Sequence, residues 1–307
     1  MTPRSVLKLA ASIALFALVL WFIGPARVWA SIANADPMYL AAGFAASLMA
    51  NVVAALRWRA LAAWLGINAP QRDMIFAYWR GVMANSMLPG ATLGGDALRT
   101  LYLQNLGHPI APAAASVLLD RLSGLWVLVT MSLSMTAVAQ AMGLLPATVL
   151  NTPAALSVVA AFLALVAPLL VWGFSTAIAQ YLPQRITAML DALHARSRPL
   201  YQYAMQIFWS GGVQVFSIAA FTFGGYAVGL QLPWWQLAIA AGPVFVFAAL
   251  PVGVGGWGTR EAAAALVLGS FGAAHDAAVA CAILYGLFAT LQGLLGAAPF
   301  FLSKGNT

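Results

Sequence analysis

Long apolar segments separated by short polar ones run along the entire chain. Six of them reach or approach the length of about 20 residues that an apolar helix needs to cross a bilayer. The apolar runs are continuous rather than alternating, so they predict membrane-spanning helices and not the strands of a transmembrane barrel. We expect these spans at Leu9–Ile23, Met38–Leu56, Ala113–Met142, Ala154–Trp172, Ala204–Gly229 and Ala277–Leu302.

Two further apolar regions, Met74–Gly107 and Trp235–Gly272, are interrupted at their centres by Pro and Gly. The interruptions fall at Asn85–Arg99 and Leu250–Glu261. Each half of a region has about 10–15 residues, which is short for a complete crossing. We therefore expect two re-entrant helix pairs, which enter the membrane, turn at an irregular segment and return. Two short full spans at each place are the alternative.

The two interrupted regions resemble each other, which indicates an internal repeat. Both contain Leu-Pro, then Gly-Gly, then an Arg four residues after the second Gly, at Arg99 and at Arg260. Downstream, Gly107 aligns with Gly269 and Gly124 with Gly286. Two halves, about 1–145 and 150–307, then each contain a span, a span, a re-entrant pair and a span, in opposite orientations. The sequence thus predicts an all-α polytopic membrane protein, a single transmembrane domain of two inverted halves.

Composition and charge agree with a membrane protein. Of the 307 residues, 63% are hydrophobic and 7% are charged, a balance that no soluble domain could bury. The net charge of +7 would suggest nucleic acid in a soluble protein, but most cations lie in short loops and favour one side of the membrane. With both termini cytoplasmic in a bacterial inner membrane, that side holds Arg4, Lys8, Arg57, Arg59, Arg72, Arg185, Arg196, Arg198 and Lys304.

The first apolar segment also resembles a secretory signal peptide that ends near Val28-Trp29-Ala30. The inverted repeat needs this helix, so we expect it to be the first span.

Ionisable side chains within the expected membrane segments are the candidates for function, because charges are costly there and mark functional sites by default. Four arginines against three acids leave one excess positive charge, which suits a lipid with an anionic headgroup. They are Arg80, Arg99, Arg121 and Arg260 with Asp96, Asp120 and Glu261. Arg80 lies about two turns before Pro89 and could simply extend to the membrane surface.

The first glycine pair, Gly94-Gly95, predicts a phosphate site. Its backbone N–H groups would face outward beside the start of a short helix, Ala97–Leu106, whose dipole attracts anions. Arg99 would add a bidentate fork for the phosphate. Asp96 has a structural alternative, since it could be the N-cap of that helix or pair with Arg99 at spacing i, i+3.

The second glycine pair, Gly255-Gly256, repeats this arrangement. Here Arg260 would bind phosphate and Thr259 would cap the helix. Glu261 lies in the first turn, where a carboxylate is favoured by the helix dipole, so its role could be purely structural.

Three more polar positions have two interpretations each. Asp120 and Arg121 are adjacent, about 100° apart on a helix, so each must pair with another segment. Such pairs could either serve the site or only lock the two halves together. Asn85 is either a polar cap at the end of its half-helix or a headgroup ligand.

Signals for an enzyme or a metal site are weak. The run Gly253-x-Gly255-x-x-Gly258 fits a dinucleotide pattern, but no soluble strand–helix unit surrounds it. The three histidines are scattered and form no metal-binding motif, and no nucleophile elbow occurs. We expect no enzyme, no cofactor and no nucleic-acid partner.

Two motifs resemble a known family. Asn85-x-x-Leu88-Pro89-Gly90 with Gly94-Gly95-Asp96-x-x-Arg99, followed by Ala115-Ser116-Val117 and Asp120-Arg121-x-x-Gly124, resembles the lysylphosphatidylglycerol synthase transmembrane-region family. Pro251, Gly255-Gly256-x-Gly258 and Arg260-Glu261 are similar to its second signature. The resemblance covers most of the chain and implies a flippase-like, lipid-translocating domain. The family's two-part synthases also carry a soluble aminoacyl-transferase domain, which has no counterpart in this sequence, so aminoacylation of lipid is doubtful.

These observations together predict an inner-membrane translocase for a polar phospholipid or a polyprenyl-linked lipid. The headgroup would lie in a cavity between the two interruptions, where the acids neutralise the arginines when it is empty. One alternative is a membrane-embedded enzyme or accessory subunit that acts on lipid-linked sugars or aminoacyl lipids; converging carboxylates would favour it. A scaffold is the other, and it predicts intramembrane charges that are all locked together.

Overall fold

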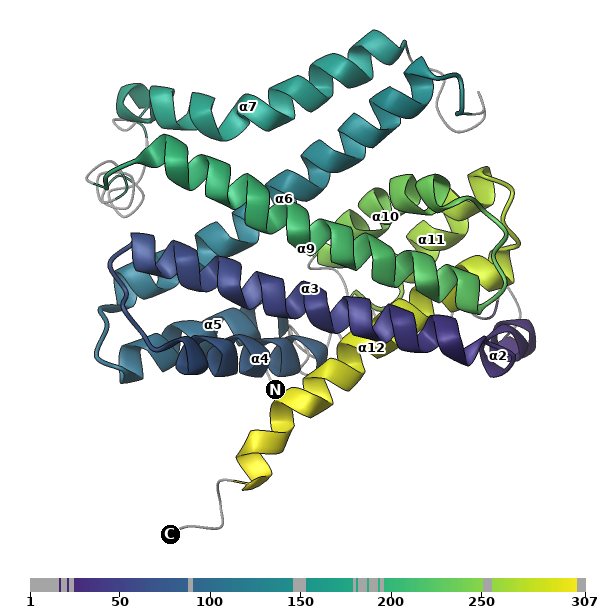
Figure 1. The fold of residues 1–307 in the computed structure, drawn as a ribbon, viewed down its shortest axis with the longest axis horizontal. Coiled ribbons are helices and arrows are strands. Elements are labelled where there is room, and N and C mark those ends of the chain that lie inside the picture. Colours follow the sequence, from purple (N-terminus) through teal and green to yellow (C-terminus); the bar gives the residue numbers. More distant parts are fainter. Residues whose placement is uncertain are drawn as a thin grey trace.

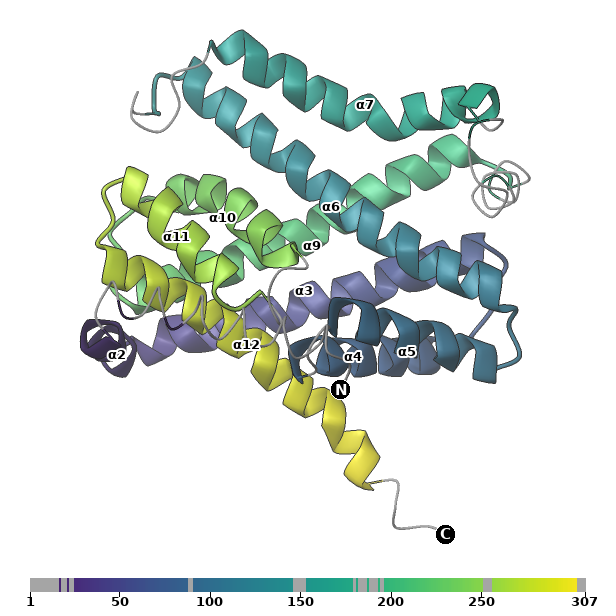
Figure 2. The same cartoon turned by 180° about the vertical axis from the view of Figure 1, so that it is seen from behind.

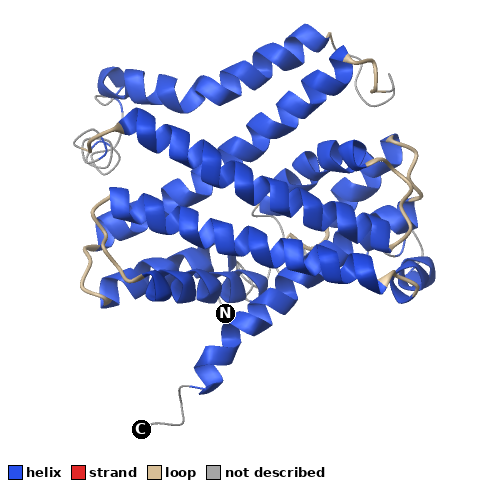
Figure 3. Cartoon of the chain, in the orientation of Figure 1, coloured by secondary structure: helices blue, strands red, loops and turns tan. Residues whose placement is uncertain are grey.

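A computed structural model describes residues 17, 21, 25–87, 91–145, 153–178, 181, 187, 193, 196–250 and 256–302. Helices dominate this part of the chain, and no strand occurs in it (Figure 3). The predicted all-α polytopic class is confirmed. The helices are α2 (Pro25–Ala33), α3 (Pro37–Trp64), α4 (Gln71–Met87), α5 (Ala91–Asn105), α6 (Ile110–Ala141), α7 (Ala154–Ile178), α9 (Pro199–Ala227), α10 (Trp234–Ala249), α11 (Thr259–Ser270) and α12 (His275–Leu302).

Five helices, α3, α6, α7, α9 and α12, are long and apolar enough to cross a membrane. They correspond to five of the six predicted spans. The predicted first span, Leu9–Ile23, lies outside the described residues except for Ala17 and Trp21.

Helix α3 begins at a capping residue and extends beyond the apolar segment that predicted it. Asp36 is the N-cap, since its Oδ1 accepts hydrogen bonds from the backbone N–H groups of Met38 (2.7 Å) and Tyr39 (3.3 Å). The helix continues beyond the predicted span Met38–Leu56, as far as Trp64, and includes Arg57. Arginine is a good helix former, so the chain stays helical through Arg57, whose charge is paired inside the protein.

Helices α3 and α9 form an antiparallel pair through the centre of the molecule (Figure 1). At one end the N–H of Asp36 donates to the carbonyl of Ala227 (2.9 Å). At the other end the indole of Trp64 donates to the carbonyl of Ser197 (3.1 Å).

The α4–α5 and α10–α11 hairpins lie at opposite ends of this central pair (Figures 1 and 2). Each hairpin packs on the long helix that follows it and also on the long helix of the other half: α4 contacts α12, and α10 contacts α6. Such reciprocal packing agrees with the proposal of two inverted halves.

The hairpin helices have 17, 15, 16 and 12 residues. At 1.5 Å per residue α11 is about 18 Å long, well short of a hydrocarbon core of about 30 Å. With 17 residues α4 is about 26 Å long, so the choice between re-entrant pairs and short full spans stays a prediction. The turns themselves, 88–90 and 251–255, lie outside the described residues, so the cavity expected between them stays a prediction.

Each half has its own hydrophobic core beside its hairpin. Trp58, Met74 and Leu103 pack together where α3, α4 and α5 meet. Phe221 and Leu237 belong to a larger cluster of α9, α10, α11 and α12. These cores hold the hairpins rigidly against the long helices and so position the charges that the hairpins carry.

Helix α7 lies at the periphery, and only 6% of the residues in its most apolar 18-residue stretch are buried. Pro168 lies inside it and cannot donate to the carbonyl of Ala164. The indole Nε1 of Trp126 donates to that carbonyl instead, at 2.7 Å. The hydroxyl of Tyr203 donates to the next carbonyl, Leu165, at 2.8 Å. Side chains from α6 and α9 thus donate hydrogen bonds to two backbone carbonyls of α7 in the turn before Pro168.

Replacing Trp126 by Phe should destabilise the protein by about 1–3 kcal/mol, because the Ala164 carbonyl then has no donor in an apolar environment. Phe keeps an aromatic ring beside Tyr203 but also loses the pyrrole part of the indole, and the control variant has the same loss. Thermal unfolding in detergent measures the effect. Trp29→Phe is the control, since Trp29 is 70% exposed; equal melting temperatures for both variants would contradict the assignment.

Candidate functional site

A buried ionic cluster lies where α3, α5 and α6 meet. The Asp120 cluster, as we call it, consists of Arg57, Asp96, Arg99, Asp120 and Arg121. At its centre, Oδ1 of Asp120 accepts from Nε of Arg57 at 2.9 Å, and Oδ2 accepts from Nη2 of Arg99 at 2.7 Å. The side chain of Asp120 is 1% exposed, and those of Arg57 and Arg99 are 6% and 4% exposed. One buried carboxylate therefore holds two buried guanidinium groups.

Arg57 joins three helices. Besides the carboxylate, its guanidinium donates to the backbone carbonyl of Asp120 (3.0 Å) and to Oγ of Ser210 on α9 (3.1 Å). Gly124 lies one turn after Asp120, and a Cβ there would come within 3.0 Å of Nη1 of Arg57. The glycine thus leaves room for the guanidinium.

Arg99 is held by aromatic rings as well as by Asp120. Its Cζ lies 4.1 Å from the ring centroid of Trp58 and 4.8 Å from that of Tyr78. Both distances allow a cation–π interaction. Its Nε is buried and has no hydrogen-bond partner among the described residues. Arg99 is therefore a fixed cation with unused donor capacity.

Asp96 pairs mainly with Arg121, not with Arg99. Nε and Nη2 of Arg121 donate to its carboxylate at 2.9–3.1 Å, whereas the predicted i, i+3 contact with Arg99 is 3.9 Å. Asp120 and Arg121 contact different partners on other helices, so that part of the sequence prediction is confirmed. Arg121 is partly exposed, at 43% of its side chain, and forms the outer edge of the cluster.

The predicted helix start at Asp96 is wrong. Helix α5 already begins at Ala91, so Gly94, Gly95 and Asp96 lie within it. The N–H of Gly95 donates to Oδ1 of Asn85 at 3.2 Å. Asn85 thus links the two helices of the hairpin, and the Gly95 N–H is already engaged. Arg80 lies apart from the cluster, 5.4 Å from the ring centroid of Tyr102.

The second motif forms a tighter and smaller site. Oε1 of Glu261 accepts from Nε (3.0 Å) and Nη2 (2.6 Å) of Arg260, and both side chains are buried. Oε2 of Glu261 accepts from the N–H of Gly258 at 2.6 Å. The predicted cap at Thr259 is wrong, because Gly258, at φ 86°, is the N-cap and Glu261 satisfies its N–H.

The surroundings of Arg260 show how the repeat has diverged. Its guanidinium lies against Gly286 of α12 and 4.6 Å from the ring centroid of Trp257. Gly286 aligns with Gly124 in the sequence, and each glycine accommodates a guanidinium. The one at Gly124 comes from α3, however, and the one at Gly286 from α11. Gly255 lies outside the described residues, and Gly256 has φ 78° beside the backbone of Ala248.

Arg57 is the site residue that the sequence prediction missed. It follows the apolar segment Met38–Leu56, so it was assigned to a cytoplasmic loop. The apolar residues that continue as far as Trp64 are the signal that could have placed it inside the span.

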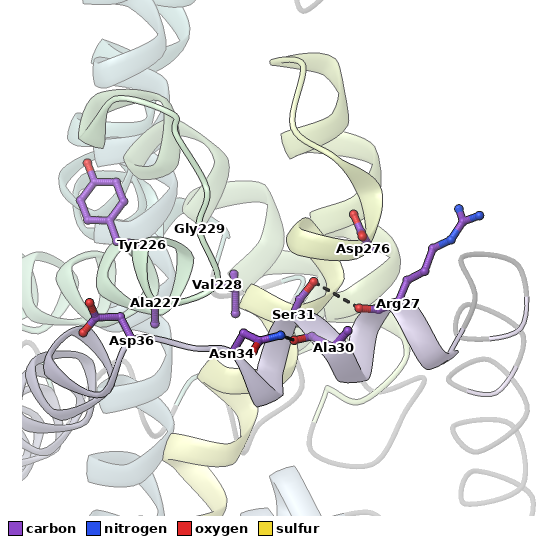
Figure 4. Close-up of a pocket in the computed structure, with 10 residues that line it drawn as sticks. All are labelled: Arg27, Ala30, Ser31, Asn34, Asp36, Tyr226, Ala227, Val228, Gly229 and Asp276. Carbon is purple, nitrogen blue, oxygen red and sulfur yellow. Dashed lines mark hydrogen bonds between the residues drawn. The ribbon is translucent and has the colours of Figure 1, made fainter.

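Two cavities are described, and neither is lined by Arg99 or Arg260. One, of about 600 Å³, is an open pocket between α2, the end of α9 and the start of α12, with Arg27, Asp36 and Asp276 at its wall (Figure 4). The other, of about 410 Å³, is an apolar groove between α6, α9 and α10. Among the described residues no three His, Cys, Asp or Glu side chains form a candidate metal site.

Comparison with known proteins identifies a family and a relative. The family model described as the lysylphosphatidylglycerol synthase TM region matches residues 5–296, which include both ionic sites. The UPF0104 membrane protein MJ1595 of Methanocaldococcus jannaschii is 24% identical over 119 residues, or 38% of this chain. The match covers about a third, 35%, of that relative's length.

Proposed function

Because the chain belongs to the family of the lysylphosphatidylglycerol synthase TM region, a lipid-related family of membrane proteins, we propose that it moves a polar lipid between leaflets. One observation carries the proposal: the Asp120 cluster holds three arginines against two acids, so one positive charge is in excess. A buried charge without a counterion is costly. The phosphate of a phospholipid or polyprenyl-linked headgroup would supply the missing negative charge.

The headgroup would bind chiefly at Arg99 and Arg57. A guanidinium offers phosphate a planar fork of donors, and Trp58 and Tyr78 keep that of Arg99 in place. When no lipid is bound, both arginines stay paired with the single carboxylate of Asp120, and one positive charge stays unbalanced. Arg260 is already balanced by Glu261, so in this proposal it is the weaker anion site of the two.

The position of the surface cations supports the proposed orientation. Arg59, Arg72 and Arg198 are exposed where α3 ends and where α4 and α9 begin. In the proposal this end faces the cytoplasm of a bacterium, and both termini lie on that side of the inner membrane.

Lipid exchange in liposomes tests the proposal. The full chain, reconstituted with a fluorescent phospholipid, should speed the loss of inner-leaflet label to an external quencher. Arg99→Gln should slow exchange at least about tenfold, because each charge-assisted hydrogen bond is worth about 1.5–3 kcal/mol. Asp120 keeps Arg57 as its partner in this variant, so the buried pair stays neutral.

Arg59→Gln is the matched control, since Arg59 is an exposed arginine near the end of α3. It should exchange lipid like the unmodified protein. Unchanged exchange with Arg99→Gln would remove Arg99 from the mechanism.

A scaffold is the second candidate, and the ion pairs favour it: Asp96, Asp120 and Glu261 all contact arginines. It predicts no exchange even by the unmodified protein in liposomes. An enzyme that acts on lipid-linked substrates has less support, because these acids contact arginines rather than converge on one another.

A further inference from the structure

A stripe of buried polar side chains runs along α9. Gln202, Gln206, Ser210 and Gln214 occur at every fourth position and are 8%, 6%, 0% and 7% exposed. Residues four apart form one ridge on a helix, and twelve residues rise about 18 Å. This glutamine stripe therefore crosses about half of a hydrocarbon core.

The inner half of the stripe contacts the Asp120 cluster. Oγ of Ser210 accepts from Nη1 of Arg57 at 3.1 Å. Nε2 of Gln214 donates to the carbonyl of Gly124 at 3.2 Å, one turn beyond Asp120 on α6. These two contacts fix the direction of the stripe: it leads from the start of α9 to the two buried arginines.

The outer half has three buried side-chain atoms without a hydrogen-bond partner in the described part of the chain. Both Nε2 and Oε1 of Gln206, and Nε2 of Gln202, are buried without a hydrogen bond. An amide in an apolar environment costs roughly 2–7 kcal/mol unless it is hydrogen-bonded. Polar side chains inside membrane proteins therefore pair with one another or face water-filled cavities or ligands.

A second group of buried polar side chains, by contrast, is hydrogen-bonded within the protein. Gln292 of α12 accepts from the amide of Asn51 and donates to Oγ of Ser47, both on α3. That trio satisfies itself and locks two helices. The unpaired amides of α9 stand in contrast to it.

We propose that the glutamine stripe lines a water-filled passage from the membrane surface at the start of α9 to Arg57, and that a phosphate-bearing headgroup travels along it. Glutamine can donate to phosphate oxygens and accept from hydroxyl or ammonium groups, so it suits such a headgroup. Arg198, exposed at the N-cap of α9, adds positive charge at the entrance. The headgroup part rests on the proposed function, whereas the passage itself does not.

Cysteine accessibility tests the passage, because the chain has one cysteine, Cys281, and it is fully buried. Gln202→Cys and Gln206→Cys would be treated in proteoliposomes with a charged methanethiosulfonate, which reacts only with thiolates in water. Phe208→Cys is the control, since Phe208 is 67% exposed on the outer face of α9 and would face lipid. We expect both glutamine positions to react at least about tenfold faster than the control. Equal rates would overturn the passage.

Protection by lipid tests the headgroup. The same variants would be labelled in vesicles of a phosphate-free galactolipid, with phosphatidylglycerol or inorganic phosphate added. Slower labelling with phosphatidylglycerol alone supports a lipid headgroup, and protection by both identifies a general phosphate path. Labelling that neither slows would overturn the headgroup part. Lipid exchange is measured separately, so the proposed function can fail while the passage stands.

Discussion

Replacing Asp120 by Asn should destabilise the folded protein by about 3–5 kcal/mol, the cost of removing one partner from a buried ion pair. Two guanidinium groups, 6% and 4% exposed, would lose their shared carboxylate and face each other across a neutral amide. The amide has nearly the same shape as the carboxylate, so the effect reports charge rather than packing. Thermal unfolding in detergent, followed by tryptophan fluorescence, measures it.

In the Asp120 cluster, removing the central acid should destabilise the protein more than removing one of the two buried arginines. Arg57→Gln or Arg99→Gln leaves Asp120 with one arginine, so each should cost less than Asp120→Asn. Asp73→Asn is the control, because Asp73 accepts only a hydrogen bond from Tyr102, at 3.2 Å, among the described residues. If Asp120→Asn melts at the same temperature as Arg99→Gln, charge balance does not hold the cluster together.

The long helices could be predicted from the sequence because the length of an apolar segment is a local property. Their ends could not always be predicted, because the cost of a charge depends on remote residues. Arg57 looks like the end of a span until Asp120, on another helix, supplies its counterion. Helix α3 then continues for two more turns.

The predictions of the helix N-caps at Asp96 and Thr259 were wrong because capping, too, depends on more than the residue itself. Asp96 and Thr259 are good capping residues, but a cap also needs the chain to turn at that place. In α5 the backbone is already helical from Ala91, before Asp96. In α11 the N-cap is Gly258 rather than Thr259, because glycine tolerates the φ of 86° at that position. The residue types in a sequence indicate which positions could be an N-cap. The place where the backbone becomes helical determines which of these positions is the N-cap.

The choice of ion-pair partners also needed the structure. The sequence predicts that Asp120 and Arg121 cannot share a partner and that each must pair with another segment, and they do. The partners follow from how α3, α5 and α6 pack. The glutamine stripe is visible in the sequence as a four-residue period, but only packing shows which of its amides are satisfied.

Gly95→Ala should be severely destabilising, whereas Gly94→Ala should not. A Cβ on Gly95 would overlap the carbonyl oxygen of Gly81 and the amide of Asn85 across the α4–α5 hairpin. Backbone cannot move aside as a side chain can, so we expect a cost of at least about 3 kcal/mol, at the upper end for overpacking. At Gly94 nothing lies within 4 Å of the added Cβ, and Ala should stabilise the helix by about 0.5–1 kcal/mol.

The two alanine variants distinguish a glycine that presents its backbone N–H from a glycine that allows close packing of the hairpin. Alanine keeps the backbone N–H, so a glycine needed only to present N–H groups to phosphate tolerates the change where space allows. Gly81 lies against both Gly95 and Arg99, since a Cβ on it would come within 2.9 Å of Cδ of Arg99. Widening the hairpin at Gly95 should therefore displace Arg99 and lower lipid exchange as well as the melting temperature. Equal stability of the two alanine variants would show that the hairpin has room at Gly95, and the close packing would not be what positions Arg99.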